Sequence, residues 1–379
     1  MSLISEHVAE LNLVDHHCHG LVMEDLPRGE FELLATESDW PAPPPTTWFD
    51  SPLGTFIRAE CAPVLDLPRH CSPEDYLQRR AHLGVAEVTG RLLRDSGIGE
   101  FVVDTGFHGD RVSSPRQLAE VSGFPAHQVT RLETLAQTVA PGASAEGFVR
   151  DVHEAIQAAA LTSVGFKSII AYRFGLDFDP TPPGPAEVLR AAGEWLSACE
   201  TAGSWRLDHP VLLRHLLWEA VPLQRPIQFH VGYGDSDITL HRCDPSQMTG
   251  FLRATVGSGT DIMLLHCYPF IREAGILAQV FPHVYLDTGL AVTHAGASAS
   301  TLVRESLEVA PFGKVLFASD AYGLPELYLA GSLLWRRAVG ELLDEWVASD
   351  AMGRDDALRY ASWMAGDNAR RVYGLEEAT

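Results

Sequence analysis

Residues 12–19 read NLVDHHCH, an apolar run that ends in histidines. The same form recurs downstream, where PIQFHVG at 226–232, DIMLLHCY at 261–268 and KVLFASDA at 314–321 each carry an apolar run into a histidine or an aspartate. Short apolar runs of this kind are typical of buried strands, and burying their polar ends without partners costs several kcal/mol. The ends of these strands therefore decide both the fold and the candidate site.

Eight such runs lie along the chain. They cover residues 12–19, 99–107, 128–135, 165–172, 226–232, 261–268, 283–289 and 314–321. Amphipathic stretches such as HPVLLRHLLWEAV separate the later runs and end near Gly or Pro, as crossover helices do. This alternation predicts parallel strands, and eight strands predict an α/β fold, a closed (β/α)8 TIM-like barrel.

The chain is longer than such a barrel requires. A (β/α)8 barrel needs about 250 residues, so a chain of 379 residues has roughly 130 to place elsewhere. Most of the surplus lies in residues 20–96, which contain the proline-rich DWPAPPPTTW before a helical stretch. We predict one barrel domain spanning 1–379, with residues 20–96 as a helical insertion after the first strand that forms a lid over the carboxyl rim. A separate small domain is disfavoured because the segment is short and broken by proline.

Composition excludes several classes of partner. The chain is 46% apolar and 21% charged, which is typical of a folded protein, and its formal net charge of -22 repels nucleic acids and anionic membranes. Its first residues lack the order of a secretory signal, and its six cysteines show no CxxC spacing, which favours reduced thiols. We predict a cytoplasmic protein that acts on a small molecule. Whether the chain forms a homo-oligomer stays open. Four tryptophans in predicted outer helices could be buried in a contact between subunits: Trp195, Trp205, Trp218 and Trp335.

The strand ends bring candidate ligands together. In a closed barrel all carboxyl ends meet at one rim, so residues far apart in sequence converge there. Period-two alternation also puts His17 and His19 on one face of their strand, where both can bind one cation. Imidazoles and a carboxylate suit zinc, which makes a bound water acidic when one coordination position is open. The residues expected to meet at this rim are His17, His19, Lys167, His230, His266 and Asp320.

Seven stretches of this sequence in combination resemble the amidohydrolase superfamily, of the amidohydrolase-2 type. They are DHHCH at 15–19, FKSIIAYR at 166–173, IQFHVGYGDSD at 227–237, LLHCYPFIREAG at 264–275, VYLDTGL at 284–290, LFASDAYGLPE at 316–326 and GDNARRVYGL at 366–375. Within the superfamily the chain is most similar to the amidohydrolase half fused to glutamine-synthetase-like domains in fungal developmental and plant nodulin proteins. The resemblance runs from about residue 10 to residue 375 and is weakest over the insertion.

The resemblance implies a metal-dependent hydrolase that attacks an amide, ester or lactone carbonyl with metal-bound hydroxide. His17, His19 and Asp320 match the first-strand pair and the eighth-strand acid of the family. Asp320 would touch the metal and act as general base and then general acid. His230 and His266 match the fifth- and sixth-strand histidines, and His266 would bind a second metal or polarise the substrate carbonyl.

Lys167 decides how many ions are expected. Only Lys167 and Lys314 are lysines among the 28 basic residues, and in family members with two metals a fourth-strand lysine is carboxylated and bridges both ions. The alternative is that Lys167 lies deeper and pairs with an acid such as Glu133. The resemblance thus implies one divalent ion, with zinc favoured, or two if Lys167 is carboxylated.

Other polar residues near the rim are candidates for substrate binding. Arg173, just past the fourth run, could hold a carboxylate with two parallel hydrogen bonds. Second candidates, which suit a surface loop equally well, are Tyr172, Tyr268, Glu273, Asp235 and Glu326, whereas His16, His241 and His294 are interpreted as structural or solvent-facing. Two other functions stay open: a metal-dependent decarboxylase, which release of carbon dioxide would reveal, and a non-catalytic binding scaffold, which would lack metal.

Overall fold

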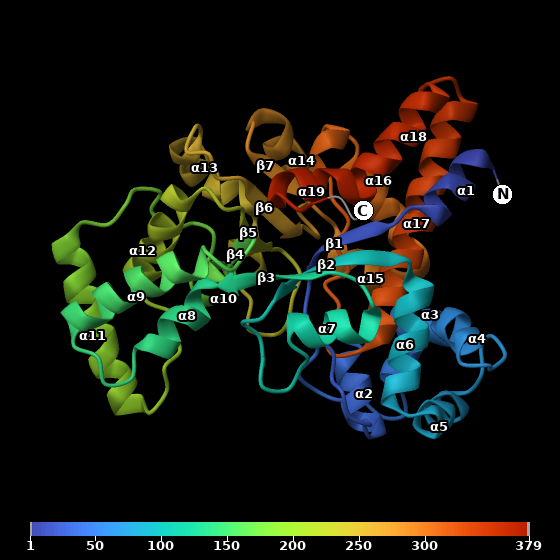
Figure 1. Ribbon diagram of the computed structural model, residues 1–379, viewed down its shortest axis with the longest axis horizontal. Helices are drawn as coiled ribbons and strands as arrows, with labels where there is room; N and C mark the ends of the chain where they lie inside the picture. The colour runs from blue at the N-terminus through green and yellow to red at the C-terminus, as the bar shows by residue number, and fades with distance from the viewer. Residues whose placement is uncertain (1, 377–379) are drawn as a thin grey trace.

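Parallel strands form the centre of the molecule, as a computed structural model that describes residues 2–376 shows (Figure 1). Every neighbouring pair of strands is parallel, and the strands follow one another in chain order around the sheet. They are β1 (Leu13–Cys18), β2 (Ile98–Asp104), β3 (Ala126–Arg131), β4 (Gly165–Ser168), β5 (Ile227–Val231), β6 (Ile262–His266) and β7 (Val284–Leu286). This order is that of the predicted α/β barrel.

The eighth predicted strand is present as an irregular segment at residues 315–321. Val315 forms a parallel bridge with Leu286 of β7, and the amide of Leu316 donates to the Leu286 carbonyl at 3.0 Å. On its other side, the His16 amide donates to the Phe317 carbonyl at 3.1 Å, and the His19 amide to that of Ala321 at 2.8 Å. The segment therefore lies between β7 and β1 and closes the barrel, although its pairing is too irregular for a continuous ladder.

Helices surround the strands on the outside. Before β2 lie α1 (Leu3–Glu10), α2 (Arg28–Leu34), α3 (Pro52–Phe56), α4 (Ala62–Val64), α5 (Pro73–Leu83) and α6 (Val85–Ser96). Between β2 and β6 lie α7 (Pro115–Ser122), α8 (Leu132–Val139), α9 (Ala145–Ala159), α10 (Ile170–Arg173), α11 (Pro185–Ala202), α12 (Pro210–Ala220) and α13 (Thr249–Thr255). The remainder are α14 (Ile271–Val280), α15 (Gly289–Ala295), α16 (Ala299–Ser306), α17 (Pro325–Ala348), α18 (Arg354–Ser362) and α19 (Asn368–Tyr373). None of the described helices is both long and apolar enough to cross a membrane.

Helix boundaries follow the local chemistry of the sequence. Ser72 precedes α5 and accepts a hydrogen bond from the Asp75 amide, and Pro73 occupies the first turn, where its missing N–H costs nothing. At the carboxyl end of another helix, α11, Gly203 has φ 66°. This left-handed conformation ends a helix most easily when the residue is glycine. These signals fix the lengths of the crossover helices and therefore where each strand begins.

Residues 20–96 pack beside the barrel and share its core (Figure 1). Phe31 and Phe49 stack with ring centroids 5.5 Å apart and belong to the same buried cluster as Phe101 of β2. Tyr76 Oη and Arg80 Nε both donate to Oε1 of Glu326 at 2.9 Å, which ties α5 to the first turn of α17. Glu326, a second candidate for substrate binding, is thus a buried structural acid, because α17 starts at Pro325 and turns its side chain into the core.

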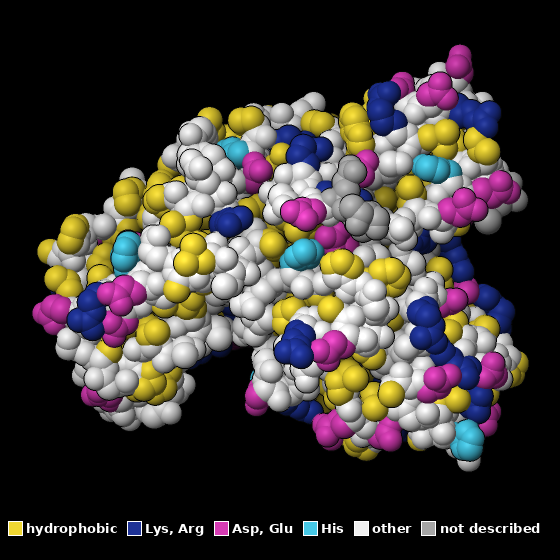
Figure 2. Space-filling model, in the orientation of Figure 1, with side chains coloured by type: hydrophobic (Ala, Val, Ile, Leu, Met, Phe, Trp, Pro, Cys, Tyr) yellow, Lys and Arg dark blue, Asp and Glu magenta, His cyan; other side chains and the backbone are white. Residues whose placement is uncertain are grey.

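The surface carries charges of both signs with scattered apolar side chains, and the face drawn in Figure 2 is hollowed between the α8–α12 region and the α2 and α7 region. Trp195 and Trp335 are buried, and Trp205 and Trp218 pack against the core. Trp205 lies in the loop between α11 and α12 and not in a helix as predicted, and the buried rings of Trp195 and Trp335 are not exposed for a subunit contact. The six cysteines are free and buried.

A smaller apolar cluster fills the inside of the barrel, and the end of the chain closes it. Val14, Val102, Val129 and Leu316 from successive barrel segments pack together with Tyr373 of α19. Gly165, the first residue of β4, makes room for the Tyr373 ring, because a Cβ there would lie 3.2 Å from Cε1 of Tyr373 and 3.0 Å from the Pro226 carbonyl oxygen. The ring of Tyr373 therefore enters the barrel from the amino ends of the strands, opposite the candidate site.

Candidate metal centre

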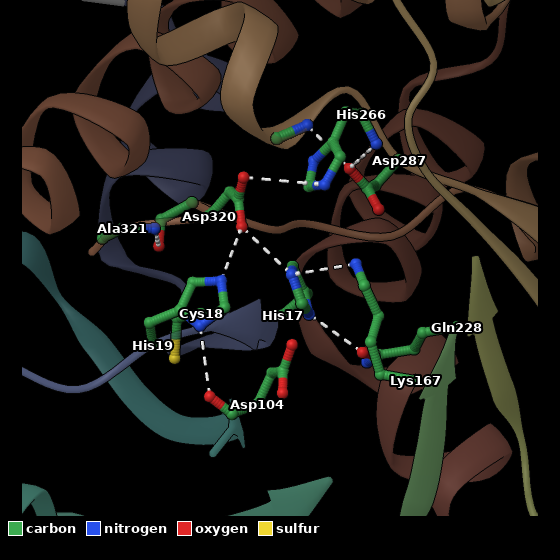
Figure 3. Close-up of polar contacts among 12 residues, drawn as sticks. His17, Cys18, His19, Asp104, Lys167, Gln228, His266, Asp287, Asp320 and Ala321 are labelled. Atoms are coloured by element: carbon green, nitrogen blue, oxygen red, sulfur yellow. Dashed lines mark hydrogen bonds and ion pairs between the residues drawn. The ribbon is translucent and has the colours of Figure 1, made fainter. Parts of the chain in front are cut away.

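Three predicted ligands lie together at the carboxyl rim. The nearest nitrogen or oxygen atoms of His17, His19 and Asp320 all lie within 4.8 Å of one another. Oδ1 of Asp320 is 3.0 Å from Nε2 of His17 and 3.4 Å from Nε2 of His19. Figure 3 shows Asp320 between this pair and His266, whose Nε2 is 3.5 Å from the other carboxylate oxygen, Oδ2.

Irregular backbone at two strand ends aims these side chains. The β1–β2 register shifts between Asp15 and Cys18, so the strand is irregular at His17. Asp320 has φ 51°, a conformation that costs free energy in a non-glycine residue and that clusters at functional sites. The side chain of Asp15 holds Ser319, the residue before Asp320. It accepts hydrogen bonds from the Ser319 amide at 2.9 Å and from the Ser319 hydroxyl. The Asp320 amide donates to the His17 carbonyl at 3.0 Å, which joins the two ligand segments.

Hydrogen bonds fix which nitrogen of each imidazole carries the proton. The amide of Gln228 lies 2.8 Å from the His16 carbonyl oxygen, which can only accept, so the contacting atom is the donor Nε2. Gln228 Oε1 then faces Nδ1 of His17 at 2.8 Å, and this nitrogen must donate. In the same way Nδ1 of His19 donates to the carbonyl oxygen of Asp104 at 3.1 Å. When either ring carries a single proton, its lone pair is therefore on Nε2, the nitrogen that faces Asp320.

These lone pairs make the three residues a suitable cation site. Burial, and next the charge of Lys167, lower the pKa of His17 to about 3, so its imidazole is neutral near pH 7 and Nε2 has no proton to give Asp320. Oδ1 of Asp320 is buried and has no hydrogen bond of acceptable geometry among the described residues. Two nitrogen lone pairs and a carboxylate oxygen thus face one another, an arrangement that repels unless a cation lies between them. The donor set fits a divalent metal of the zinc type.

His230 and His266 form the opposite side of the same centre. Their rings have centroids 4.8 Å apart, and Nε2 of His230 and Nδ1 of His266 are buried without a hydrogen-bond partner in the described chain. Burial lowers the pKa of His266 to about 4 and that of His230 well below its usual value, so both rings are neutral. His266 has φ 69°, and its amide donates to Oδ1 of Asp287 at 2.9 Å, which anchors the end of β6. These nitrogens without a hydrogen-bond partner are available to bind substrate or a second ion.

The amine of Lys167 reaches the rim. Its Nζ is 3.4 Å from Nε2 of His17, and burial lowers its pKa to about 8. Glu133, the alternative partner, instead accepts hydrogen bonds from the Ser168 hydroxyl at 2.7 Å and the Ile169 amide at 3.0 Å. Lys167 therefore lies beside the predicted metal ligand His17, and its alternative pair with Glu133 is not formed.

A cavity of about 340 Å³ opens from the candidate metal centre. Arg173 and Tyr172, two of the predicted substrate-binding residues, end the short helix α10 and line this cavity. Nε of Arg173 is buried without a hydrogen-bond partner among the described residues, while Nη1 lies 3.6 Å from Oδ2 of Asp237. The Tyr172 ring packs on His230 with centroids 4.3 Å apart, and Gly234 permits this, because a Cβ there would lie only 2.1 Å from Tyr172 Oη.

Several cavity residues were missed by the sequence analysis. Glu37 from the insertion and His294 of α15 face each other across the wall, with Nε2 of His294 3.8 Å from Oε1 of Glu37. Asp237 also lines the cavity and binds Arg206 Nη2 at 2.7 Å. Asp235, named only as a second candidate, is in the wall as well. The DSD sequence after the fifth run was the available signal for the aspartates, whereas nothing in the local pattern pointed to Glu37.

Two predicted substrate residues lie elsewhere. Neither Tyr268 nor Glu273 is among the described residues that line the cavity. The backbone turns sharply after β6, with positive φ at both His266 and Cys267, and this turn carries Tyr268 to the surface, where 43% of it is exposed. Glu273 follows on the outer face of α14. Position just after a strand end was therefore an insufficient guide to these two side chains.

The chain matches a known family over more than half of its length. The family model described as amidohydrolase matches residues 135–375. The chain belongs to the amidohydrolase family. This amidohydrolase is 31% identical over 303 residues to protein fluG of Emericella nidulans, an alignment that covers 77% of the chain and 33% of fluG. The chain thus spans about a third of the length of the curated relative it matches.

Solved structures agree on the architecture. A protein from Lactobacillus casei that is assigned as a metal-dependent hydrolase superimposes with a TM-score of 0.87 at 28% identity, covering 98% of this amidohydrolase and 97% of that chain. A uronate isomerase from Bacillus halodurans superimposes with a TM-score of 0.66 at 14% identity over 98% and 96% of the two chains. The second likeness concerns the fold alone. The predicted family and the α/β barrel fold are confirmed.

Proposed function

We propose that this amidohydrolase is a zinc-dependent hydrolase that opens an amide, ester or lactone bond in a small molecule. The observation that carries the proposal is the convergence of three potential ligand atoms, Nε2 of His17, Nε2 of His19 and Oδ1 of Asp320. A divalent cation held there would supply Lewis acidity, which lowers the pKa of water and polarises a carbonyl. The other groups of the site are arranged to bind substrate and move protons.

Asp320 is the proposed general base. Its Oδ1 faces the two β1 histidines, and its Oδ2 is turned toward His266. Oδ2 is therefore the oxygen left to take a proton from the attacking water and later to return it to the leaving group. His266, neutral because burial lowers its pKa to about 4, would orient the substrate carbonyl from the opposite side.

Arg173 is the proposed anchor for an acidic group of the substrate. Its buried Nε lacks a partner in the described chain, and the Tyr172 ring beside it restricts the approach to His230. Residues 33–39 of the insertion would cover the substrate, because Leu33, Leu34 and Glu37 belong to the cavity wall. The proposed substrate is therefore a small carboxylated amide, ester or lactone.

Lys167 is proposed to set the number of ions. As an ammonium group 3.4 Å from Nε2 of His17 it would repel a cation, and carboxylation would remove that charge and add two oxygen ligands. With bicarbonate present we expect about two zinc equivalents in the wild type and about one in Lys167→Met. Lys167→Arg, which keeps a permanent charge, should bind even the first ion at least about tenfold more weakly than Lys167→Met. Equal zinc content and affinity in all three proteins would remove this role.

A metal analysis combined with a substrate screen tests the function. The protein should bind zinc, and the zinc-loaded protein should hydrolyse a member of a panel of N-acyl amino acids, glutamyl amides and lactones. Release of carbon dioxide from a candidate acid without hydrolysis would indicate a decarboxylase instead. Protein with less than about a tenth of an equivalent of any transition metal, and no gain on adding zinc or manganese, would indicate a non-catalytic scaffold.

A further inference from the structure

A chain of buried hydrogen bonds runs beneath the candidate metal centre to the last helix. Gln228 lies in β5, two residues before His230, and is fully buried. Its Oε1 accepts from Nδ1 of His17, and its Nε2 donates to the His16 carbonyl, each at 2.8 Å. The second hydrogen of the same Nε2 points at the hydroxyl oxygen of Tyr373, also at 2.8 Å. Every polar atom of the Gln228 amide is thus used, and only one orientation of the amide satisfies all three contacts.

The hydroxyl of Tyr373 continues the chain in one direction. Because Tyr373 Oη accepts from Gln228, its own proton is available for Nδ1 of His16, 3.1 Å away. Nε2 of His16 then carries a ring proton, which it donates to Oδ2 of Asp287 at 2.9 Å. Oδ1 of Asp287 accepts from the amide of His266 at 2.9 Å. One hydroxyl group on α19 therefore sits between the segments that carry His17 and His266.

Tyr373 belongs to the last helix, so this arrangement joins segments that are far apart in the sequence. The side chain is 2% exposed and enters the barrel through the space that Gly165 leaves open. Reversing the Gln228 amide would place its NH2 group against the Nδ1 proton of His17 and its oxygen against the His16 carbonyl. The hydroxyl of Tyr373 adds a third hydrogen bond to the Gln228 amide and so holds the amide in place.

We propose that Gln228 and Tyr373 are positioning residues for the metal ligand His17, with Tyr373 acting through Gln228. Gln228 holds the proton of His17 on Nδ1 and so presents the Nε2 lone pair to the cation. The His16 carbonyl sets the orientation of the Gln228 amide, and Tyr373 holds the amide in place beside His17. The last helix of the barrel thereby contributes to metal affinity from the opposite end of the strands. The inference rests on the metal centre of the proposed function.

Zinc affinity in a double-mutant cycle tests the inference. We would prepare the wild type, Gln228→Leu, Tyr373→Phe and the double variant, and measure their zinc dissociation constants by competition with a chromophoric chelator. Gln228→Leu should weaken zinc binding by about 10–100-fold, the usual cost of losing a partner that orients a ligand. Tyr373→Phe should weaken it by about 3–10-fold, because Gln228 keeps its contact with the His16 carbonyl. In the Gln228→Leu background, Tyr373→Phe should change the affinity by less than about twofold.

Tyr285→Phe is the matched control, since Tyr285 belongs to the same interior cluster but has no part in this chain of hydrogen bonds. Its zinc affinity should equal that of the wild type, and thermal unfolding of the metal-free proteins would report any general loosening. Additive effects in the double variant, an unchanged affinity in Gln228→Leu, or an equal loss in Tyr285→Phe would overturn the inference. A wild type that binds no zinc would instead overturn the proposed function, so the two failures are distinguishable.

Discussion

The histidines of β1 and the histidines of β5 and β6 meet at one rim, but they are held differently. Nδ1 of His17 and Nδ1 of His19 each donate to a buried acceptor, the Gln228 amide oxygen and the Asp104 carbonyl. Nε2 of His230 and Nδ1 of His266 are buried without any such acceptor in the described residues. The two sides of the centre therefore differ in how far the protein has oriented them in advance.

The difference assigns separate tasks to the two sides. A ligand whose tautomer and ring plane are fixed binds a metal with little reorganisation, so the β1 side is suited to holding the ion. A buried nitrogen without a partner is costly unless a ligand or substrate completes it, so the β5 and β6 side is suited to the reaction. Asp320 lies between them, with one carboxylate oxygen turned to each side. The following four predictions test this division, from the largest expected effect to the smallest.

Asp320→Asn should affect both sides at once. The amide keeps the shape of the side chain but removes the negative charge that faces the two Nε2 lone pairs and the proposed proton acceptor. Zinc affinity should fall by more than about 100-fold, since even residues that only orient a ligand contribute 10–100-fold, and hydrolysis should become undetectable. Chelator competition and a turnover assay measure the two effects, and circular dichroism checks the fold. Near-stoichiometric zinc together with substantial turnover in this variant would contradict the assignment.

His266→Asn should separate the reaction from metal binding. We expect turnover to fall by about 100-fold to 1,000-fold, the usual cost of removing a group that stabilises developing charge, with the first zinc retained. The matched variant His17→Asn should lose the zinc itself. Zinc analysis and kcat are measured on both proteins. Equal loss of zinc in the two variants would remove the distinction between the sides.

Arg173→Met should weaken substrate binding without disturbing the ion. A hydrogen bond to a charged group contributes about 1.5–3 kcal/mol, so KM for a carboxylated substrate should rise by about 10–100-fold while zinc content stays constant. Arg190→Met, on the exposed face of α11, is the control and should leave KM unchanged. An unaltered KM in Arg173→Met, or an equal rise for a substrate without a carboxylate, would exclude the proposed anchor.

Tyr268→Phe and Glu273→Gln should have the smallest effects. Both residues lie outside the cavity, and substitutions at such positions usually change free energies by less than about 0.5 kcal/mol, so kcat and KM should stay within about twofold of the wild type. Steady-state kinetics on the best substrate of the screen measures this. A tenfold rise in KM would show that the turn after β6 moves into the cavity when substrate binds.

The sequence was informative where geometry follows from strand order. Runs ending in His17, His266 and Asp320 predicted a shared rim, because the carboxyl ends of parallel strands in a barrel must meet. Even the irregular segment at 315–321 was identified, since its apolar pattern survives the distorted backbone. The barrel fold and the meeting of the three residues could therefore be predicted without coordinates.

Other parts of the site depend on backbone detail that sequence does not encode locally. The positive φ values at His266 and Cys267 direct Tyr268 outward, and no pattern in the sequence LLHCYP predicts these values. Glu37 reaches the cavity only through the path of a long insertion. Gln228 was identifiable in principle, because a glutamine two residues before a histidine in the apolar run IQFH shares the face of that histidine. Its partner Tyr373 is 145 residues away and could be found only in the fold.

Diffraction from crystals of the zinc-loaded protein at the zinc absorption edge tests the central claim most directly. We predict an anomalous peak for one zinc ion that is coordinated by Nε2 of His17, Nε2 of His19 and Oδ1 of Asp320, at about 2.0–2.2 Å from each atom. An anomalous peak only elsewhere on the protein, or His17 hydrogen-bonded directly to Asp320 with no ion between them, would contradict this claim.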